Sequence, residues 1–362
     1  MRNFYLFCFS LAMVLMFGSV AHTQSTMNIY LNDGSVMQIP LNQIDSVTHS
    51  TDGDPLFEPL VETSGIDCVL KDRFEAMGEV LNDGGLEVTL RGICWSTSPE
   101  PTVDDNVLES GSGVGAFMVE ITDLQMETTY FVRAFAVNGM GVGYGEVLEV
   151  ATPGVIDDFL NVSLDYGEVS DIDGNTYATI IVGDQEWMAE NLRTTTYSNG
   201  DEIPIVTDDD TWEWLDDGAC VWYMNDCNSE IPYGRLYNWH AVEDDRNICP
   251  AGWHVPDNDE WDELTDLFGG MAAGGALKSA GTLYWFDPNM GGSNESGMSL
   301  LPGGFREDDG FFNALGVMAC YWTSTDYGPN DAFYRELSYG HSNIFTTFEN
   351  RRSGFSVRCV KD

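Results

Sequence analysis

Two cysteines bracket the most unusual part of this chain. Cys249 opens the segment CPAGWHVPDNDEWDEL, Cys359 lies in the closing GFSVRCVKD, and the interval between them is rich in Trp, Gly and Asp. Few runs in this interval are long enough for a helix, so regular secondary structure alone cannot order it. We interpret it as a loop-rich domain closed by a Cys249–Cys359 disulfide, which would stabilise it by roughly 3–5 kcal/mol.

The segment after Cys249 contains the clearest helix signal. Asp257 is a good N-cap, and Glu260 three residues later completes a capping box. One helical face then carries Trp261, Leu264, Leu267 and Phe268, before Gly269 and Gly270 stop the helix. A second short helix is expected over Ala272–Ala280. Short strands are predicted at Ser299–Leu301, Cys320–Thr325, Phe333–Ser338 and Phe355–Val360.

The N-terminus predicts export. Residues 1–21 contain an early arginine, an apolar run and a small-x-small site at Ser19–Ala21, the pattern of a secretory signal peptide. Cys8 lies inside the apolar run, too early to carry a lipid anchor. No later run approaches the ~20 apolar residues that a membrane span needs. We expect a secreted, extracellular or cell-surface protein without a transmembrane segment.

Export makes the remaining cysteines disulfide candidates, and their odd number leaves at least one unpaired. Cys220 and Cys227 are close in sequence and are predicted to form a small-loop bridge. Cys68 and Cys94 could pair, or could be two buried thiols that behave as small apolar groups. Cys320 is then the odd one, and its pairing with Cys220 or Cys227 stays open.

The charge excludes one class of partner. The chain has 59 acidic and 15 basic residues, a formal net charge of −44, which repels phosphate backbones and anionic lipids. With 43% hydrophobic residues the chain is globular. We interpret the acidity as solubility outside the cell, and nucleic acid as a poor partner.

Residues 27–50 predict a β-hairpin, because Asn32-Asp33-Gly34 separates two extended apolar runs. A lone hairpin is marginal in water, so this one is expected to pair with a neighbour.

Residues 60–153 predict an all-β sandwich, because short β runs alternate with turns. The predicted strands are Glu75–Leu81, Glu87–Ser96, Ala116–Ile121, Thr129–Asn138 and Glu146–Ala151. The sandwich resembles a fibronectin type III domain, with Trp95 in the core and Tyr130 at the family's tyrosine corner, which implies a spacing or adhesive role.

Residues 160–362 carry seven motifs, namely DIDGNTYATIIVGDQEWMAENL, CVWYMND, YGRLYNWHAV, CPAGWHVPDNDEWDEL, LPGGF, YWTST and GFSVRCVKD. In this order they resemble the Fibrobacter succinogenes major paralogous domain, a module of secreted bacterial proteins. That family is similar to the C-type lectin-like fold, whose ends meet and whose loops are held by a helix-to-last-strand disulfide. The expected fold class is therefore multidomain, with an all-β fibronectin III-like sandwich followed by an α+β C-type lectin-like domain.

Two departures limit what this resemblance implies. Calcium-dependent lectins use Glu-Pro-Asn or Gln-Pro-Asp in the long loop, whereas the nearest string here is Gly328-Pro329-Asn330-Asp331. Formylglycine-generating enzymes share a related fold but need a reactive cysteine pair late in the domain, and apart from the structural Cys359 this chain offers only Cys320 there. Acidic loops such as 208–210 could hold a weak calcium ion, but solvated charge is the favoured interpretation. We predict no resident cofactor or metal.

Tryptophans suggest where a ligand would bind. Most are expected in the core, because a loop-rich domain needs large side chains to exclude water. Trp212, Trp214 and Trp285 lie in acidic or Gly/Asn-rich contexts and are predicted to stack on sugar rings. Asn330 and Asp331 complete the predicted ligand-binding set.

The sequence contains no nucleophile elbow, phosphate loop or zinc spacing, so no catalytic residue is predicted. The predicted function is a non-enzymatic, secreted or cell-surface binding or adhesion protein that presents a lectin-like module to a glycan or protein ligand. One alternative is a formylglycine-generating-type oxidase or a hydrolase on the same scaffold. Another is a structural matrix component that assembles through the N-terminal hairpin.

Overall fold

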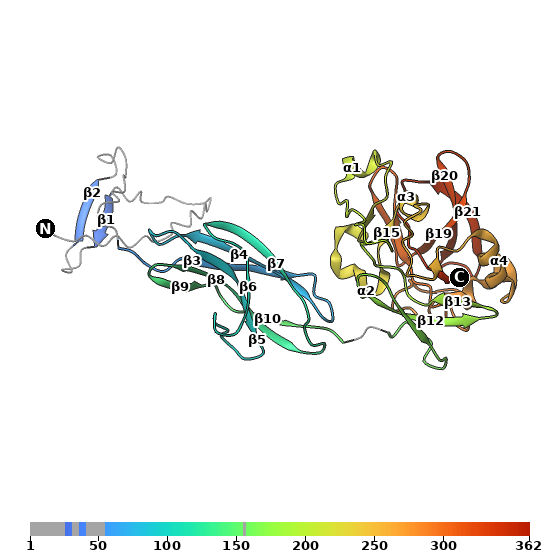
Figure 1. Cartoon of the computed structure of the whole chain (residues 1–362), viewed down its shortest axis with the longest axis horizontal. Helices are drawn as coiled ribbons and strands as arrows, with labels where there is room; N and C mark the ends of the chain where they lie inside the picture. Colours follow the sequence, from blue (N-terminus) through green and yellow to red (C-terminus); the bar gives the residue numbers. More distant parts are fainter. Residues whose placement is uncertain (1–25, 31–35, 41–54, 155–156) are drawn as a thin grey trace, which may run out of the picture. The chain divides into compact units, whose positions relative to one another are not determined.

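The computed structural model describes residues 26–30, 36–40, 55–154 and 157–362. The predicted signal peptide lies outside these residues. Strands β1 (Thr26–Tyr30) and β2 (Val36–Pro40) pair antiparallel, with Ile29 opposite Met37 (Figure 1). This is the pairing that the Asp-Gly signal predicted, although the turn itself is outside the described residues.

The sandwich consists of two antiparallel sheets (Figure 1). One has the order β3-β4-β7, and the other has the order β10-β8-β5-β6, with β9 also paired to β8. This division of consecutive strands between two sheets is a fibronectin type III-like arrangement. The strands are β3 (Leu60–Asp67), β4 (Phe74–Asn82), β5 (Leu90–Ser96), β6 (Asn106–Glu109), β7 (Gly115–Ile121), β8 (Thr129–Asn138), β9 (Gly141–Tyr144) and β10 (Leu148–Ala151).

The sandwich core follows from alternation along its strands. Tyr130 and Val132 point inward on β8, and the Tyr130 hydroxyl accepts a hydrogen bond from the backbone N–H of Gln125 at 3.0 Å. This is the expected tyrosine corner. Trp95, predicted as the core tryptophan, is only partly buried because it lies near the end of β5, whereas Ile93 on the same strand is fully buried.

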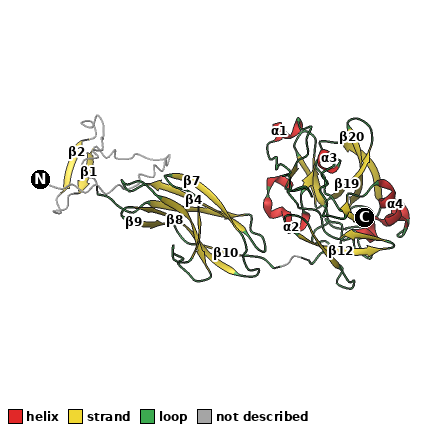
Figure 2. Cartoon of the chain, in the orientation of Figure 1, coloured by secondary structure: helices red, strands yellow, loops and turns green. Residues whose placement is uncertain are grey.

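The C-terminal domain contains two five-stranded sheets (Figure 2). The first has the order β11-β12-β13-β22-β16, so its earliest strands and the last strand of the chain lie in one sheet. Its strands are β11 (Gly167–Ser170), β12 (Thr176–Val182), β13 (Gln185–Met188), β16 (Trp253–His254) and β22 (Val360–Lys361). The second, of order β18-β17-β19-β20-β21, contains β17 (Gly303–Arg306), β18 (Phe312–Leu315), β19 (Met318–Asp326), β20 (Asp331–Ser338) and β21 (Ile344–Asn350).

Helices of this domain are short, apart from α4 (Asn258–Asp266), which begins with the predicted capping box between Asp257 and Glu260. Trp261 and Leu264 are buried by α4, but Leu267 at its end is exposed. The predicted second helix is split into a 3-10 turn (Gly270–Ala273) and α5 (Gly274–Leu277). The remaining short elements are α1 (Asp209–Glu213), 3-10 turns at Tyr223–Asn225 and Cys227–Ser229, α2 (Glu230–Tyr233), α3 (Trp239–Val242), β14 (Cys220–Val221) and β15 (Leu236–Tyr237).

Two of the four strands predicted after residue 298 lie within β19 and β20. Ser299–Leu301 is a loop with one bridge, Lys278 to Leu300, and most of Phe355–Val360 is a buried irregular segment. Strand β21 was missed because its Thr-rich sequence, IFTTFEN, has a weak apolar alternation. Within the described residues, no helix is both long and apolar enough to cross a membrane.

The disulfides correct part of the cysteine prediction. Cys249 and Cys359 are joined, as expected, with their Cα atoms 6.0 Å apart. The predicted Cys220–Cys227 bridge is wrong, because Cys227 is joined to Cys68 in the sandwich. Cys220 is instead a free thiol in the main core, and Cys94 and Cys320 are also free and buried.

Candidate ligand-binding site

Strands β20 and β21 present an aromatic face to solvent. Ala332 and Tyr334 alternate inward on β20, so Phe333 points outward, and Phe348 lies directly opposite it on β21. The ring of Tyr327, from the loop before β20, stacks on Phe348 with the ring centroids 3.9 Å apart and lies 4.9 Å from Phe333. Tyr327 and Phe348 remain 47% and 45% exposed. We call these three residues, Tyr327, Phe333 and Phe348, the aromatic platform.

A polar cleft of about 280 Å³ is lined by residues that continue this face. Asn350 lies two residues after Phe348 on β21, and side chains two apart on a strand point to the same side of the sheet. The lining residues are Asp216, His240, Pro329, Asn330, Asn350, Arg351 and Arg352. The platform and the cleft therefore belong to one continuous surface.

Arg351 orders one wall of the cleft. Its guanidinium lies 4.2 Å from the ring centroid of Trp239, donates to Glu243 at 2.9 Å and donates to the carbonyl of Gly328 at 2.8 Å. Its backbone N–H also donates to the carbonyl of Asn330. These contacts fix the loop that carries Asn330.

Arg352 holds the opposite wall but keeps donor capacity. Its Nε donates to the carbonyl of Leu215, and its Nη2 donates to Asp216, both at 3.0 Å. Within the described residues, Arg352 Nη1, the Nε2 of His240 and the side-chain amide of Asn330 have no hydrogen-bond partner. The cleft thus offers several polar groups, and they are carried by loops that the hydrogen bonds of Arg351 and Arg352 fix in place.

The cleft is close to electrically balanced, unlike the chain as a whole. Arg351 is paired with Glu243, and Arg352 is paired with Asp216. His240 Nδ1 lies 3.1 Å from the same Glu243. Such a site can hydrogen-bond to neutral hydroxyl groups without the field of a strongly charged pocket.

Two of the predicted sugar-stacking tryptophans are buried, so that prediction is wrong for them. Trp212 is fully buried beneath the guanidinium of Arg306, which lies 4.4 Å from its ring centroid. Trp285 is 1% exposed and donates its indole N–H to the carbonyl of Leu300 at 3.1 Å. Both belong to apolar clusters of the core, Trp212 with Val221 and Leu236, and Trp285 with Leu277 and Leu300.

The other predicted residues lie at or near the surface. Trp214 is 71% exposed at the end of α1, two residues before Asp216 of the cleft. Asn330 lines the cleft. Asp331 begins β20, and its carbonyl accepts from the backbone N–H of Tyr327, which closes the turn beneath the platform.

The aromatic platform and the two arginines were not predicted. Phe333 between the inward Ala332 and Tyr334 carries a signal for an outward aromatic side chain, but the missed strand β21 hid its pairing with Phe348. Arg351 and Arg352 lie in a short loop without a motif. Their role follows only from the neighbours that the fold brings to them.

The free thiols are not suited to covalent chemistry. Cys320 is 1% exposed, and burial raises its pKa well above the usual value. Burial likewise raises the pKa of Cys220 to about 11. Because the nucleophile in thiol chemistry is an accessible thiolate, these surroundings disfavour the oxidase alternative.

His254 and Asp67 lie among groups that could suggest a metal site. Both ring nitrogens of His254 are engaged, Nδ1 with Asp362 at 2.7 Å and Nε2 with Glu260 at 2.8 Å. Asp67 lies within metal-ligand distance of Cys68 and Cys227, but those two sulfur atoms are bonded to each other. This group is therefore part of a disulfide and not a ligand set for a metal.

Comparison with known proteins gives one family match. The family described as the Fibrobacter succinogenes major domain matches residues 180–361. No curated protein matches the chain.

Several solved structures are similar to part of the chain, and three of them cover 27–31% of its length. They include the sensor domain of the anti-sigma factor RsgI4 of Pseudobacteroides cellulosolvens, at 12% identity over 27% of this chain and 98% of that one, with a TM-score of 0.22. The sixth fibronectin type III domain of a human protein, fibronectin type III domain containing protein 3, matches at 22% identity over 29% and 94%, with a TM-score of 0.23. The third fibronectin III domain of human KIAA0343 matches at 19% identity over 31% and 94%, with a TM-score of 0.19.

Proposed function

The chain belongs to the Fibrobacter succinogenes major domain family, and on that premise we propose that it is an exported, non-enzymatic protein whose C-terminal domain binds a neutral glycan. The ligand lies across the aromatic platform and extends into the cleft between Asn330 and Arg352. The sandwich serves as the spacer that carries this domain.

The observation that carries the proposal is an exposed aromatic platform beside a polar cleft. A pyranose ring has a face of C–H groups that packs on an aromatic ring, and hydroxyl groups at its rim that need hydrogen-bond partners. Tyr327 and Phe348 supply the stacking surface. Arg352 Nη1, His240 Nε2 and the side-chain amide of Asn330 supply polar groups that have no hydrogen-bond partner among the described residues.

Charge favours a neutral glycan over an acidic one. The chain has a formal charge of −44, which repels polyanionic ligands at long range. The arginines that could attract a carboxylate already face Glu243 and Asp216. The remaining donors are therefore better matched to sugar hydroxyls than to acidic groups.

Export is supported by the disulfides and by the predicted signal peptide at residues 1–21. Disulfides such as Cys249–Cys359 form and persist in oxidising compartments. A relation to the C-type lectin-like fold is also part of the proposal. Its supports are that the first strands and the last strand of the domain share one sheet, and that a disulfide joins the segment before α4 to the segment before β22.

The test is a binding measurement on the full chain against matched neutral and acidic oligosaccharides. We expect neutral sugars to bind and Phe348→Ala to weaken binding about tenfold, the effect of losing about 1.4 kcal/mol of stacking. The single variant Arg352→Gln should also weaken the binding of neutral sugars, because it removes a hydrogen-bond donor to the sugar hydroxyl groups. Calorimetry or an array with a titration provides the affinities.

Phe286→Ala is the matched control, because Phe286 is also an exposed aromatic but belongs to another loop. It should leave the affinity unchanged. Binding to acidic sugars alone would overturn the choice of a neutral ligand. Binding to a protein but to no sugar would reject the glycan and leave the platform as a protein-binding surface.

A further inference from the structure

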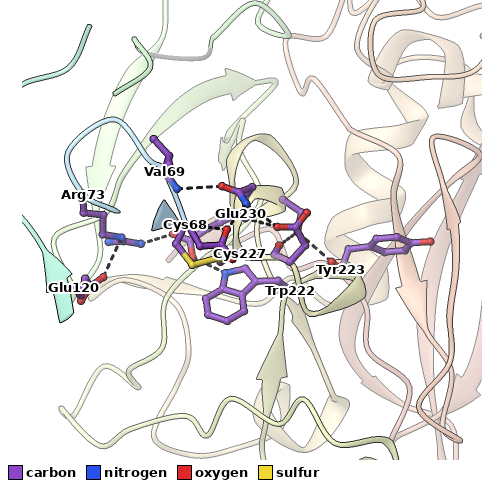
Figure 3. The surroundings of a disulfide bond; sticks show 12 residues. Cys68, Val69, Arg73, Glu120, Trp222, Tyr223, Cys227 and Glu230 are labelled. Carbon is purple, nitrogen blue, oxygen red and sulfur yellow. Dashed lines mark hydrogen bonds and ion pairs between the residues drawn. A yellow bond between two sulfur atoms is a disulfide. The ribbon is translucent and has the colours of Figure 1, made fainter. Parts of the chain in front are cut away.

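A buried carboxylate lies where the sandwich touches the C-terminal domain. Glu230, at the start of α2, has a side chain only 2% exposed. Its Oε1 accepts from Arg73 of the sandwich at 2.6 Å, and its Oε2 accepts from the indole of Trp222 at 2.8 Å (Figure 3). The same Oε2 also accepts from Arg235 at 2.8 Å. A buried charge is costly unless it is paired and hydrogen-bonded, and here it has three donors.

Those donors are not equivalent. Arg235 and Trp222 belong to the same domain as Glu230, and the Arg235 guanidinium lies 4.2 Å from the Trp222 ring centroid. Arg73 comes from the loop between β3 and β4 of the sandwich, is 29% exposed, and also pairs with Glu120 on β7. Arg235 and Trp222 therefore hold Glu230 in place, and Arg73 docks onto it from the other domain.

The other end of the same loop is held covalently. Cys68 is bonded to Cys227, which is 159 positions later in the chain (Figure 3). Beside this bond, the side chain of Asn228 accepts from the backbone N–H of Val69 at 3.1 Å and donates to Asp67 at 3.0 Å. The loop 67–73 is thus held by hydrogen bonds and an ion pair as well as by the disulfide.

We propose that this junction, made by Cys68, Arg73, Cys227, Asn228 and Glu230, is a redox latch between the two domains. The contacts of Arg73 and Asn228 first place the two thiols side by side. Oxidation then makes the docking permanent: the two thiols lose two electrons and two protons to a disulfide-bearing oxidant, which becomes a dithiol. The C-terminal domain is held on the sandwich in the oxidised protein and released from it in the reduced one.

The latch opens selectively. Cys68 is partly buried and Cys227 is 8% exposed, whereas Cys249 and Cys359 of the other disulfide are 2% and 0% exposed. Reduction proceeds by attack of a thiolate on an accessible sulfur atom. A mild dithiol should therefore reduce Cys68–Cys227 first and leave the C-terminal domain closed.

The test uses the full chain and does not depend on the ligand. Peptide mapping of the unreduced protein should find Cys68 linked to Cys227. Small-angle X-ray scattering should then show a larger radius of gyration for a Cys68→Ser, Cys227→Ser, Arg73→Gln variant than for the wild type. The matched control is the variant Cys68→Ser, Cys227→Ser, Arg246→Gln, because Arg246 forms its ion pairs within the C-terminal domain. The control should expand less.

The order of the two steps has its own readout. After mild reduction and removal of the dithiol, Arg73→Gln alone should re-form the Cys68–Cys227 bond several-fold more slowly than Arg246→Gln. Circular dichroism verifies that each variant is folded. Free thiols at both positions in the unreduced protein, or unchanged scattering in the triple variant, would overturn the latch. Equal re-oxidation rates would overturn the docking step.

Discussion

The sandwich and the C-terminal domain satisfy their backbone groups by different means. The sandwich uses strand ladders, and within residues 60–151 its buried polar side chains are uncharged, namely Thr63 and Asn138. The C-terminal domain has long loops whose carbonyl groups have no ladder to join. It buries six basic side chains among them, namely Arg193, Arg235, Lys278, Arg306, Arg335 and Arg358.

These buried cations act as donors to loop carbonyls. Lys278 donates from Nζ to the carbonyls of Met290, Ser338 and His341 at 2.9–3.0 Å. Arg306 donates to the carbonyls of Gly310 and Val206, among others. A guanidinium has five N–H groups in a fixed fork, so one side chain can order several loop segments at once. Many of the few basic residues of this acidic chain are therefore buried inside one domain.

The largest effect should come from Arg358, which is fully buried. It donates to Asn191 and to the carbonyls of Met188, Met298 and Ser299. Arg358→Met leaves three buried carbonyls without a donor, at about 1–3 kcal/mol each, so we expect the C-terminal domain to lose about 3–9 kcal/mol of stability. Urea unfolding followed by tryptophan fluorescence measures it, since nearly all tryptophans lie in this domain.

Arg91→Met is the matched change in the sandwich. Arg91 also donates to several loop carbonyls, including those of Ser110 and Val114, but from a partly exposed position where water can replace it. We expect a loss of about 1 kcal/mol. Equal losses for Arg358→Met and Arg91→Met would refute the contrast between the two domains.

The second effect concerns the covalent closure of the loops. The Cys249–Cys359 bond spans 110 positions, so replacing both cysteines by alanine should destabilise the C-terminal domain by roughly 4–5 kcal/mol. Calorimetry should show the sandwich transition unchanged. Cys320→Ala, which removes a buried but unpaired thiol, controls for lost packing. A fall as large for Cys320→Ala would mean that packing and not closure is responsible.

Local signals and family motifs were enough to predict several features. The capping box at Asp257 and Glu260 depends on neighbours in sequence, and so does the Asp-Gly hairpin signal between β1 and β2. Tyr130 was found because the fibronectin type III fold assigns it a place, and the Cys249–Cys359 pair because the two cysteines bracket a loop-rich interval, in agreement with the family resemblance. These features need little knowledge of distant packing.

The rest depends on contacts between segments far apart in sequence. Cys227 lies seven positions from Cys220, yet its partner is Cys68, because β14 carries Cys220 into the core while the turn after it faces the sandwich loop. Trp212 looks exposed in its acidic context, but it is covered by Arg306, almost a hundred residues later. Neither outcome leaves a local pattern.

A smaller effect tests a tyrosine-to-backbone hydrogen bond that occurs in both domains. In the sandwich Tyr130 accepts from the N–H five residues earlier, and in the C-terminal domain Tyr166 accepts from that of Asn161 in the same way. Tyr166 also donates to the carbonyl of Gly297. Tyr130→Phe should therefore cost about 1 kcal/mol and Tyr166→Phe more, because two partners are left. If calorimetry shows a larger loss of stability for Tyr130→Phe than for Tyr166→Phe, the additional hydrogen bond to the carbonyl of Gly297 does not add to stability.

The smallest effect is a pH dependence confined to the C-terminal domain. Burial lowers the pKa of His254, but hydrogen bonds to Asp362 and Glu260 outweigh it and leave that pKa raised. A raised pKa in the folded state stabilises the protein fully below about pH 6.5, and the benefit is lost as pH rises through the folded-state pKa. Since His254 is 40% exposed, we expect at most about 1 kcal/mol. His254→Gln should flatten the difference in melting temperature between acidic and alkaline buffer, and Asp362→Asn should flatten it in part. An unchanged slope in both variants would locate the titrating group elsewhere, and an unchanged sandwich transition throughout would confirm that the effect belongs to one domain.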